Sequence, residues 1–164
     1  MLTEAQRKTI IESWRLAEPL GETVADLFYK RLFDIAPQYR HLFEDDLEPQ
    51  KRKLIGMIRF MVKSCDWTDN MWGEAVDMES DLFLVVLALG RRHSDLYHVP
   101  DEAYEAVGEA LIWTLDYGLG EAFTEHVSEA WVTLYTRVSQ AMKMGRFAVG
   151  QASVVGRSKE VIHV

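Results

Sequence analysis

The chain has 164 residues, with 26 acidic against 18 basic side chains, a formal net charge of −8 and one cysteine. A chain of this length most simply forms one domain, and its acidic balance argues against nucleic acid and anionic membranes as partners. The lone Cys65 excludes an intramolecular disulfide framework and fits a reducing compartment, so we expect a cytoplasmic protein.

Helix signals dominate the first part of the chain. Thr3 and Gln6 form a capping-box pattern before a first amphipathic stripe. A second stripe follows Gly21, and Pro37 interrupts it where a short new helix can start. A third helix is expected from about Pro49. The three stripes are Ile10, Ile11 and Trp14; Val24, Leu27, Phe28, Leu32 and Ile35; and Leu54, Met57, Ile58, Met61 and Cys65.

The longest apolar run, eight residues from Leu82 to Leu89, is too short to span a bilayer. Its period alone does not distinguish a buried strand from a buried helix. No other segment alternates with a period of two, and a single strand would leave its backbone groups unpaired. We therefore expect a fourth helix here, buried on most sides.

Two further helices complete the expected domain. The fifth starts at Pro100 or Asp101, and the sixth runs from a Thr124 cap to Gly145 with the most regular stripe in the chain. The sequence thus predicts an all-α domain of six or more helices over residues 1–145. Residues 146–164 lose the helical pattern, and we expect them to form a mobile tail.

Common enzyme motifs are absent from the sequence, including glycine-rich phosphate loops, zinc helices and nucleophile elbows. The acidic stretch at 44–48 lacks the spacing of a calcium loop, so a solvated loop is the simpler interpretation. The five histidines include no pair at ligand spacing on a helix. His93 stands out because an imidazole buried beside an apolar run needs a partner.

Three separated segments follow an order seen in a known family. The segment "LFYKRLFDIAPQYRHLF" contains Tyr29, Pro37 and Phe43, and "LALGRRHSDLYHVPDEAYEAVGEALIWTL" contains a histidine and a proline before an amphipathic helix. The last predicted helix has "EAW", ending at Trp131, and then Tyr135. Together they resemble the globin family, in particular bacterial single-domain globins and the globin domain of flavohaemoglobins. The resemblance implies a globin fold of six to eight helices around a haem pocket.

The resemblance also assigns residues to a haem b site. His93 would be the proximal ligand of a pentacoordinate iron, although a satisfied core or surface histidine is the simpler interpretation of any single histidine. One of the two arginines at 91 and 92, assigned here to Arg92, would pair with a haem propionate. Phe43 would stack on the haem. The remaining expected cofactor contacts are Phe28, Lys53, Leu54, Tyr104 and Val107.

Tyr29 and Gln50 are the expected distal pair. The Tyr29 phenol would donate a hydrogen bond to a bound gas, the alternative being a core tyrosine with its hydroxyl at the surface. Gln50 matches a glutamine of the similar bacterial globins, although it follows Phe43 by only seven positions, a shorter connection than the family usually has. A shift of register would give its role to Lys51 or Lys53.

Two features depart from the family pattern. Tyr104 matches a tyrosine that the family links through a glutamate to the proximal histidine, but Arg146 stands at the glutamate position. We therefore expect weaker electron donation and reversible binding rather than O–O cleavage. Residues 66–80 read as an insertion whose Trp67 and Trp72 either pack the loop or cover the haem edge or a partner surface.

The resemblance thus implies a haem globin, monomeric or homodimeric, that binds or transports dioxygen and also binds nitric oxide and carbon monoxide. We expect no room for flavin and nicotinamide domains after residue 145, so nitric oxide dioxygenase activity, the second hypothesis, would need an external reductase. A gas sensor signalling through the insertion or the tail is the third. A helical bundle without a cofactor is the fourth.

Overall fold

The computed structural model describes residues 2–66, 86, 88–93 and 98–145. The described chain is helical throughout, apart from short connections, and Val86 and residues 88–93 are also in helical conformation. The elements in order are α1 (Glu4–Ala17), η1 (Glu18–Leu20), α2 (Gly21–Ile35), η2 (Pro37–Leu42), α3 (Glu48–Asp66), α5 (Asp101–Leu119), η3 (Gly120–Ala122) and α6 (Glu125–Gly145), where η denotes a 3-10 helix. The predicted all-α class is confirmed.

Several sequence predictions concern residues that the structure does not describe. Most of the insertion at 66–80, the position of Arg146 and the tail at 146–164 lie outside the described residues. The hypothesis of a sensor depends on these segments. Within the described parts of the chain, no helix is both long and apolar enough to cross a membrane.

The helix boundaries follow from local hydrogen bonding. Thr3 Oγ1 accepts a hydrogen bond from the Gln6 amide at 3.1 Å, and Gln6 Oε1 accepts one from the Thr3 amide at 3.0 Å, which is the predicted capping box. Thr124 Oγ1 accepts a hydrogen bond from the Val127 amide at 3.4 Å, at the start of α6. Pro100 directly precedes α5. The predicted starts of α1, α5 and α6 are therefore confirmed.

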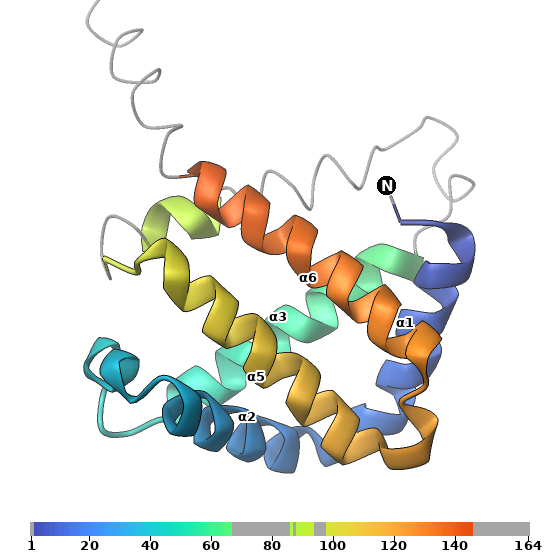
Figure 1. The fold of residues 1–164 in the computed structure, drawn as a ribbon, viewed down its shortest axis with the longest axis horizontal. Helices are drawn as coiled ribbons and strands as arrows, with labels where there is room; N and C mark the ends of the chain where they lie inside the picture. The colour runs from blue at the N-terminus through green and yellow to red at the C-terminus, as the bar shows by residue number, and fades with distance from the viewer. Residues whose placement is uncertain (1, 67–85, 87, 94–97, 146–164) are drawn as a thin grey trace, which may run out of the picture.

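The helices pack in crossing layers around one core (Figure 1). In Figure 1, α5 and α6 cross the near face, α3 lies behind them, and α1 and α2 close the bundle at its edges. Trp131 is fully buried and lies edge-on to Trp14, with 6.4 Å between ring centroids. Its indole N–H donates a hydrogen bond to Ser13 Oγ at 2.9 Å, so the polar atom of Trp131 is satisfied, whereas the buried indole N–H of Trp14 has no such partner among the described residues.

Candidate functional site

An aromatic cluster forms where α2 faces η2 and the following residues. Tyr29 is buried on α2, and its ring lies edge-on to those of Phe28 and Phe43, at centroid distances of 5.0 and 5.7 Å. Phe33 joins the cluster, 6.0 Å from Tyr29 and 5.4 Å from Phe43. The structure thus brings together three residues that the sequence assigned to the site. It adds Phe33, whose spacing of four residues from Tyr29 on one helix is the signal that could have identified it.

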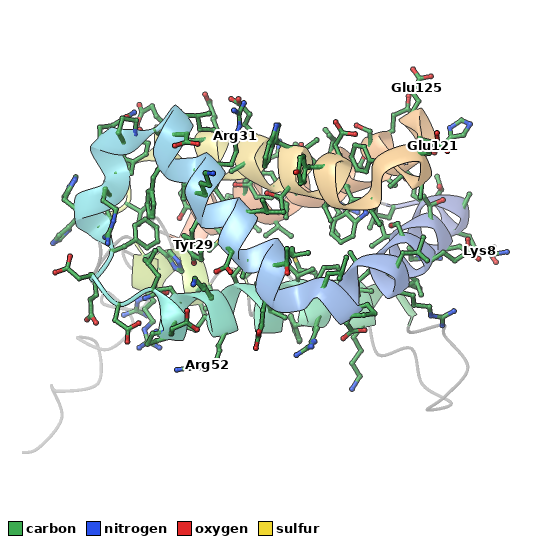
Figure 2. All side chains as sticks on the ribbon, turned by 90° about the horizontal axis from the view of Figure 1, so that it is seen from below. Lys8, Tyr29, Arg31, Arg52, Glu121 and Glu125 are labelled. Carbon is green, nitrogen blue, oxygen red and sulfur yellow. The ribbon has the colours of Figure 1, made fainter. Side chains whose placement is uncertain are left out.

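The Tyr29 hydroxyl points from α2 toward the first turn of α3. It donates a hydrogen bond to the backbone carbonyl of Gln50 at 3.3 Å. Figure 2 shows the Tyr29 side chain between these two helices. Burial raises the pKa of the Tyr29 phenol from 10.0 to about 12, because the charged phenolate is poorly solvated there. Tyr29 is therefore protonated, and a hydrogen-bond donor, at any physiological pH.

The first two turns of α3 contain the three candidates for the second distal group. Gln50 is half-buried beside Tyr29, whereas Lys53 is exposed. The Lys51 ammonium lies 2.6 Å from carboxylate oxygens of both Asp26 and Glu48. The pKa of Lys51 is raised by these hydrogen bonds, first by Asp26 and then by Glu48. Lys51 is thus bound to carboxylates and Lys53 is exposed, whereas Gln50 contacts Tyr29 through its backbone carbonyl.

His93 ends the described helical segment 88–93 and is half-buried. Its Nδ1 atom lies 2.8 Å from the carbonyl oxygen of Leu89, one turn earlier. A carbonyl oxygen only accepts, so Nδ1 must carry the hydrogen. In the neutral imidazole the lone pair is then on Nε2, as in a histidine that binds a metal through that atom. The geometry of His93 therefore fits an iron ligand. The neighbouring Arg91 and Arg92 are exposed.

The helix that carries His93 packs directly on the end of α6. A Cβ atom built on Gly90 would lie 2.0 Å from the carbonyl oxygen of Met142 and 2.5 Å from its Cα atom. These are backbone atoms, which cannot rotate away as a side chain would. Figure 1 agrees, since the yellow-green segment lies next to the red end of α6. Gly90 is thus required for the approach of the two backbones, three residues before His93.

The residues expected on α5 lie in two different settings. Val107 is half-buried and packs against the core. Tyr104 is buried, its carbonyl accepts a hydrogen bond from the Tyr135 hydroxyl, and Lys143 Nζ lies 5.9 Å from its ring centroid. Tyr104 and Tyr135 also line an open groove of about 550 Å³ between α5 and α6. These contacts of Tyr104 are with α6 and not with the aromatic cluster around Tyr29.

The other residues expected to contact the cofactor differ in their exposure. Leu54 is half-buried and packs against the core, and Lys53 and Arg92 are exposed. Among the residues that the structure describes, no three or more histidine, cysteine, aspartate and glutamate side chains are grouped so that they could hold a metal ion.

Known proteins match most of the chain. The model of the family described as "Globin" matches residues 26–142. A flavohemoprotein of Vibrio cholerae is 26% identical over 140 residues, which cover 85% of this chain and 33% of that protein. Neuroglobin-1 of Oncorhynchus mykiss is 28% identical over 156 residues, covering 88% of this chain and 92% of that protein. The chain thus spans about a third of the flavohemoprotein and nearly all of the neuroglobin.

The fold also matches a solved structure. The crystal structure of a hexacoordinated heme protein from an anhydrobiotic tardigrade superposes with a TM-score of 0.75 at 16% sequence identity. The match covers 89% of this chain and 96% of the tardigrade protein. At this identity the likeness concerns the fold alone.

Proposed function

Because the chain belongs to the globin family and so is a haem-binding protein, we propose that His93 ligates the iron of haem b and that the protein reversibly binds dioxygen, nitric oxide or carbon monoxide. The observation that carries the proposal is the hydrogen bond from His93 Nδ1 to the Leu89 carbonyl, which places the hydrogen of the neutral imidazole on Nδ1 and its lone pair on Nε2. A haem held by His93 would supply the iron that binds the gas, and the proposal takes this iron to be pentacoordinate.

On the distal side, Tyr29 is the proposed hydrogen-bond donor to the gas. Its burial keeps the phenol protonated, so the hydroxyl can donate but the side chain carries no charge that would attract water. Phe28 and Phe43 flank its ring and keep the surroundings apolar. A donor in a dry pocket favours a polarised ligand such as dioxygen. We assign the side-chain amide of Gln50 as the second donor.

The other residues would hold the cofactor. Leu54 and Val107 are apolar and half-buried, as expected for contacts with a porphyrin face or edge. Lys53 and Arg92 are exposed cations, which suits propionate groups that extend toward solvent. Buried Tyr104 would support the proximal side from α5.

An absorption spectrum tests the proposal. The protein expressed with a haem supply should show a Soret band, and its ferrous spectrum should change on addition of carbon monoxide. The His93→Ala variant should lose this response or bind haem weakly. His126→Ala is the matched control, because His126 is an exposed histidine on α6. An unchanged ferrous spectrum in His93→Ala would overturn the assignment of His93 as the ligand.

Nitric oxide dioxygenase activity with a separate reductase is the second candidate. It is favoured by the similarity to the flavohemoproteins of Vibrio cholerae and Halalkalibacterium halodurans, at 26% and 28% identity. This chain spans 33% and 27% of those proteins, so an electron donor would have to come from elsewhere. The test is stoichiometric nitrate formation from the oxygenated protein and nitric oxide, sustained over many turnovers only when a reductase is added.

A further inference from the structure

Two neighbouring contacts join the start of α3 to α2. The first is the hydrogen bond from the Tyr29 hydroxyl to the Gln50 carbonyl, at 3.3 Å. The second is the ion triad of Asp26, Lys51 and Glu48, in which Lys51 Nζ lies 2.6 Å from an oxygen of each carboxylate. We call this triad the Lys51 clip. Only its Asp26 arm crosses between helices, since Glu48 and Lys51 share the first turn of α3.

The two contacts act on the same pair of helix turns. Asp26 precedes Tyr29 by three residues, so both lie on one face of α2. Lys51 follows Gln50 directly in the chain. The Lys51 amide also donates to the Leu47 carbonyl at 2.9 Å, which makes this turn part of a regular helix start. The Asp26 arm of the clip therefore links α2 to the same turn of α3 that carries the Gln50 carbonyl.

The Tyr29 hydroxyl has a single hydrogen to donate. In the described arrangement the Gln50 carbonyl accepts it across 3.3 Å, which is longer than the usual range of about 2.5–3.0 Å for an O–H···O hydrogen bond, so the carbonyl is a weak acceptor. A ligand on the distal side would draw on the same hydrogen. The Gln50 carbonyl and the ligand are then competing acceptors, and the position of the first turn of α3 decides how strongly the carbonyl competes.

We propose that the Lys51 clip is a positioning device that holds the Gln50 carbonyl beside Tyr29 and so limits the hydrogen bond that Tyr29 gives to a distal ligand. The inference rests on the proposed function, in which Tyr29 faces that ligand. Releasing the Asp26 arm lets the carbonyl withdraw, and Tyr29 then donates more fully to the ligand. The clip thus tunes ligand escape without touching the ligand.

The test compares two charge-neutralising variants of the haem-loaded protein. Asp26→Asn and Glu48→Gln remove equivalent partners, because both carboxylates lie 2.6 Å from Lys51 Nζ and are 61% and 62% exposed. Only Asp26→Asn releases the link to α2. We expect it to lower the C–O stretching frequency of the carbon monoxide complex and to slow dioxygen dissociation about threefold, as a stronger distal hydrogen bond does. Glu48→Gln should leave both unchanged.

Lys51 variants and a remote ion pair extend the comparison. Lys51→Met should lower the C–O frequency as Asp26→Asn does. Lys51→Arg keeps the positive charge and should have the same C–O frequency as the unmodified protein. Lys8→Met removes an exposed pair on α1, with Glu12 at 3.9 Å, and should have no effect. A raised C–O frequency with faster dioxygen dissociation in Asp26→Asn would overturn the proposal. That result is expected if the clip only stabilises the fold, because its loss would then loosen the site and weaken the distal hydrogen bond. Equal effects of Asp26→Asn and Glu48→Gln would also overturn it.

Tyr29→Phe separates this inference from the proposed function. If Tyr29 faces the ligand, Tyr29→Phe raises the C–O frequency, and Asp26→Asn has no further effect in that background. An unchanged frequency in Tyr29→Phe contradicts the distal role of Tyr29, and with it the inference. A shifted frequency in Tyr29→Phe together with no shift in Asp26→Asn contradicts the clip alone.

Discussion

The backbone of Gly90 lies directly against the backbone of Met142, so close that a Cβ atom on Gly90 would stand 2.0 Å from the Met142 carbonyl oxygen. Contacts this short do not occur between real atoms, and the obstacle is main chain. The backbone contact with the end of α6 therefore sets the position of the segment that carries His93. Under the proposed role of His93, this contact affects both the stability of the fold and the position of the iron ligand.

Gly90→Ala should lower the free energy of unfolding by about 1–3 kcal/mol, the usual cost of overpacking a close contact. Gly56→Ala and Gly118→Ala are the controls, because a Cβ atom at either helical position meets nothing within 4 Å. These controls should be neutral or stabilising by up to about 1 kcal/mol, from helix propensity. Urea denaturation of the haem-loaded proteins measures all three. A Gly90→Ala variant as stable as the controls would contradict the close contact.

The raised pKa of Tyr29 predicts a loss of stability at alkaline pH. Between pH 10 and about 12 the unfolded phenol releases its proton while the native phenol keeps it, so stability falls as the pH rises through this range. The full effect is about 2–3 kcal/mol. Tyr29→Phe should make the decline of the unfolding free energy shallower over this window. The same slope in both proteins would show that Tyr29 titrates as an exposed tyrosine does.

Ser13→Ala should leave the buried indole N–H of Trp131 without its acceptor. Ser13 Oγ lies 2.9 Å from Trp131 Nε1, and both side chains are buried. We expect a loss of about 1–3 kcal/mol in thermal or urea unfolding, the cost of an unsatisfied buried donor. Ser13→Thr retains the hydroxyl and should retain part of the stability. Ser128→Ala on α6 is a control at a half-buried serine. Equal losses at the two serines would contradict a specific role of the hydrogen bond.

Gly108→Ala should force the Tyr135 ring to move. A Cβ atom on Gly108 would lie 2.4 Å from Cε1 of that ring and 2.8 Å from Cδ1. The single variant should lose about 1–3 kcal/mol of stability. In a Tyr135→Ala background the same change should cost less, because the obstructing ring is gone. A denaturation cycle of the four proteins measures the coupling, and strictly additive losses would contradict the contact.

The helices and the family were predictable because their signals are local or ordered along the chain. Three such signals are visible in the sequence alone: the capping box at Thr3, the apolar stripe of α6, and the order of Tyr29, Pro37 and Phe43. The predicted globin family and fold are confirmed by the family match and by the tardigrade structure. These predictions did not require knowledge of how the helices pack in three dimensions.

Other features of the site depend on how helices cross, which no local pattern encodes. Asp26 and Lys51 are far apart in sequence, and many surface charges stand at similar separations without meeting. The acceptor of the Tyr29 hydroxyl is a backbone carbonyl, and every residue has one. The Tyr135 ring, whose hydroxyl contacts Tyr104, packs directly over Gly108. A glycine in the sequence does not indicate which side chain packs over it. The proposed iron ligation by His93 stays a prediction.

The two close-packed glycines differ in how they could change over evolutionary time. At Gly108 the obstacle is the side chain of Tyr135, so descendants of this sequence could exchange both residues together and keep the fold. At Gly90 the obstacle is the main chain of Met142, which substitution cannot remove. Lineages should therefore show paired variation at 108 and 135, and at position 90 either glycine or a displaced helix.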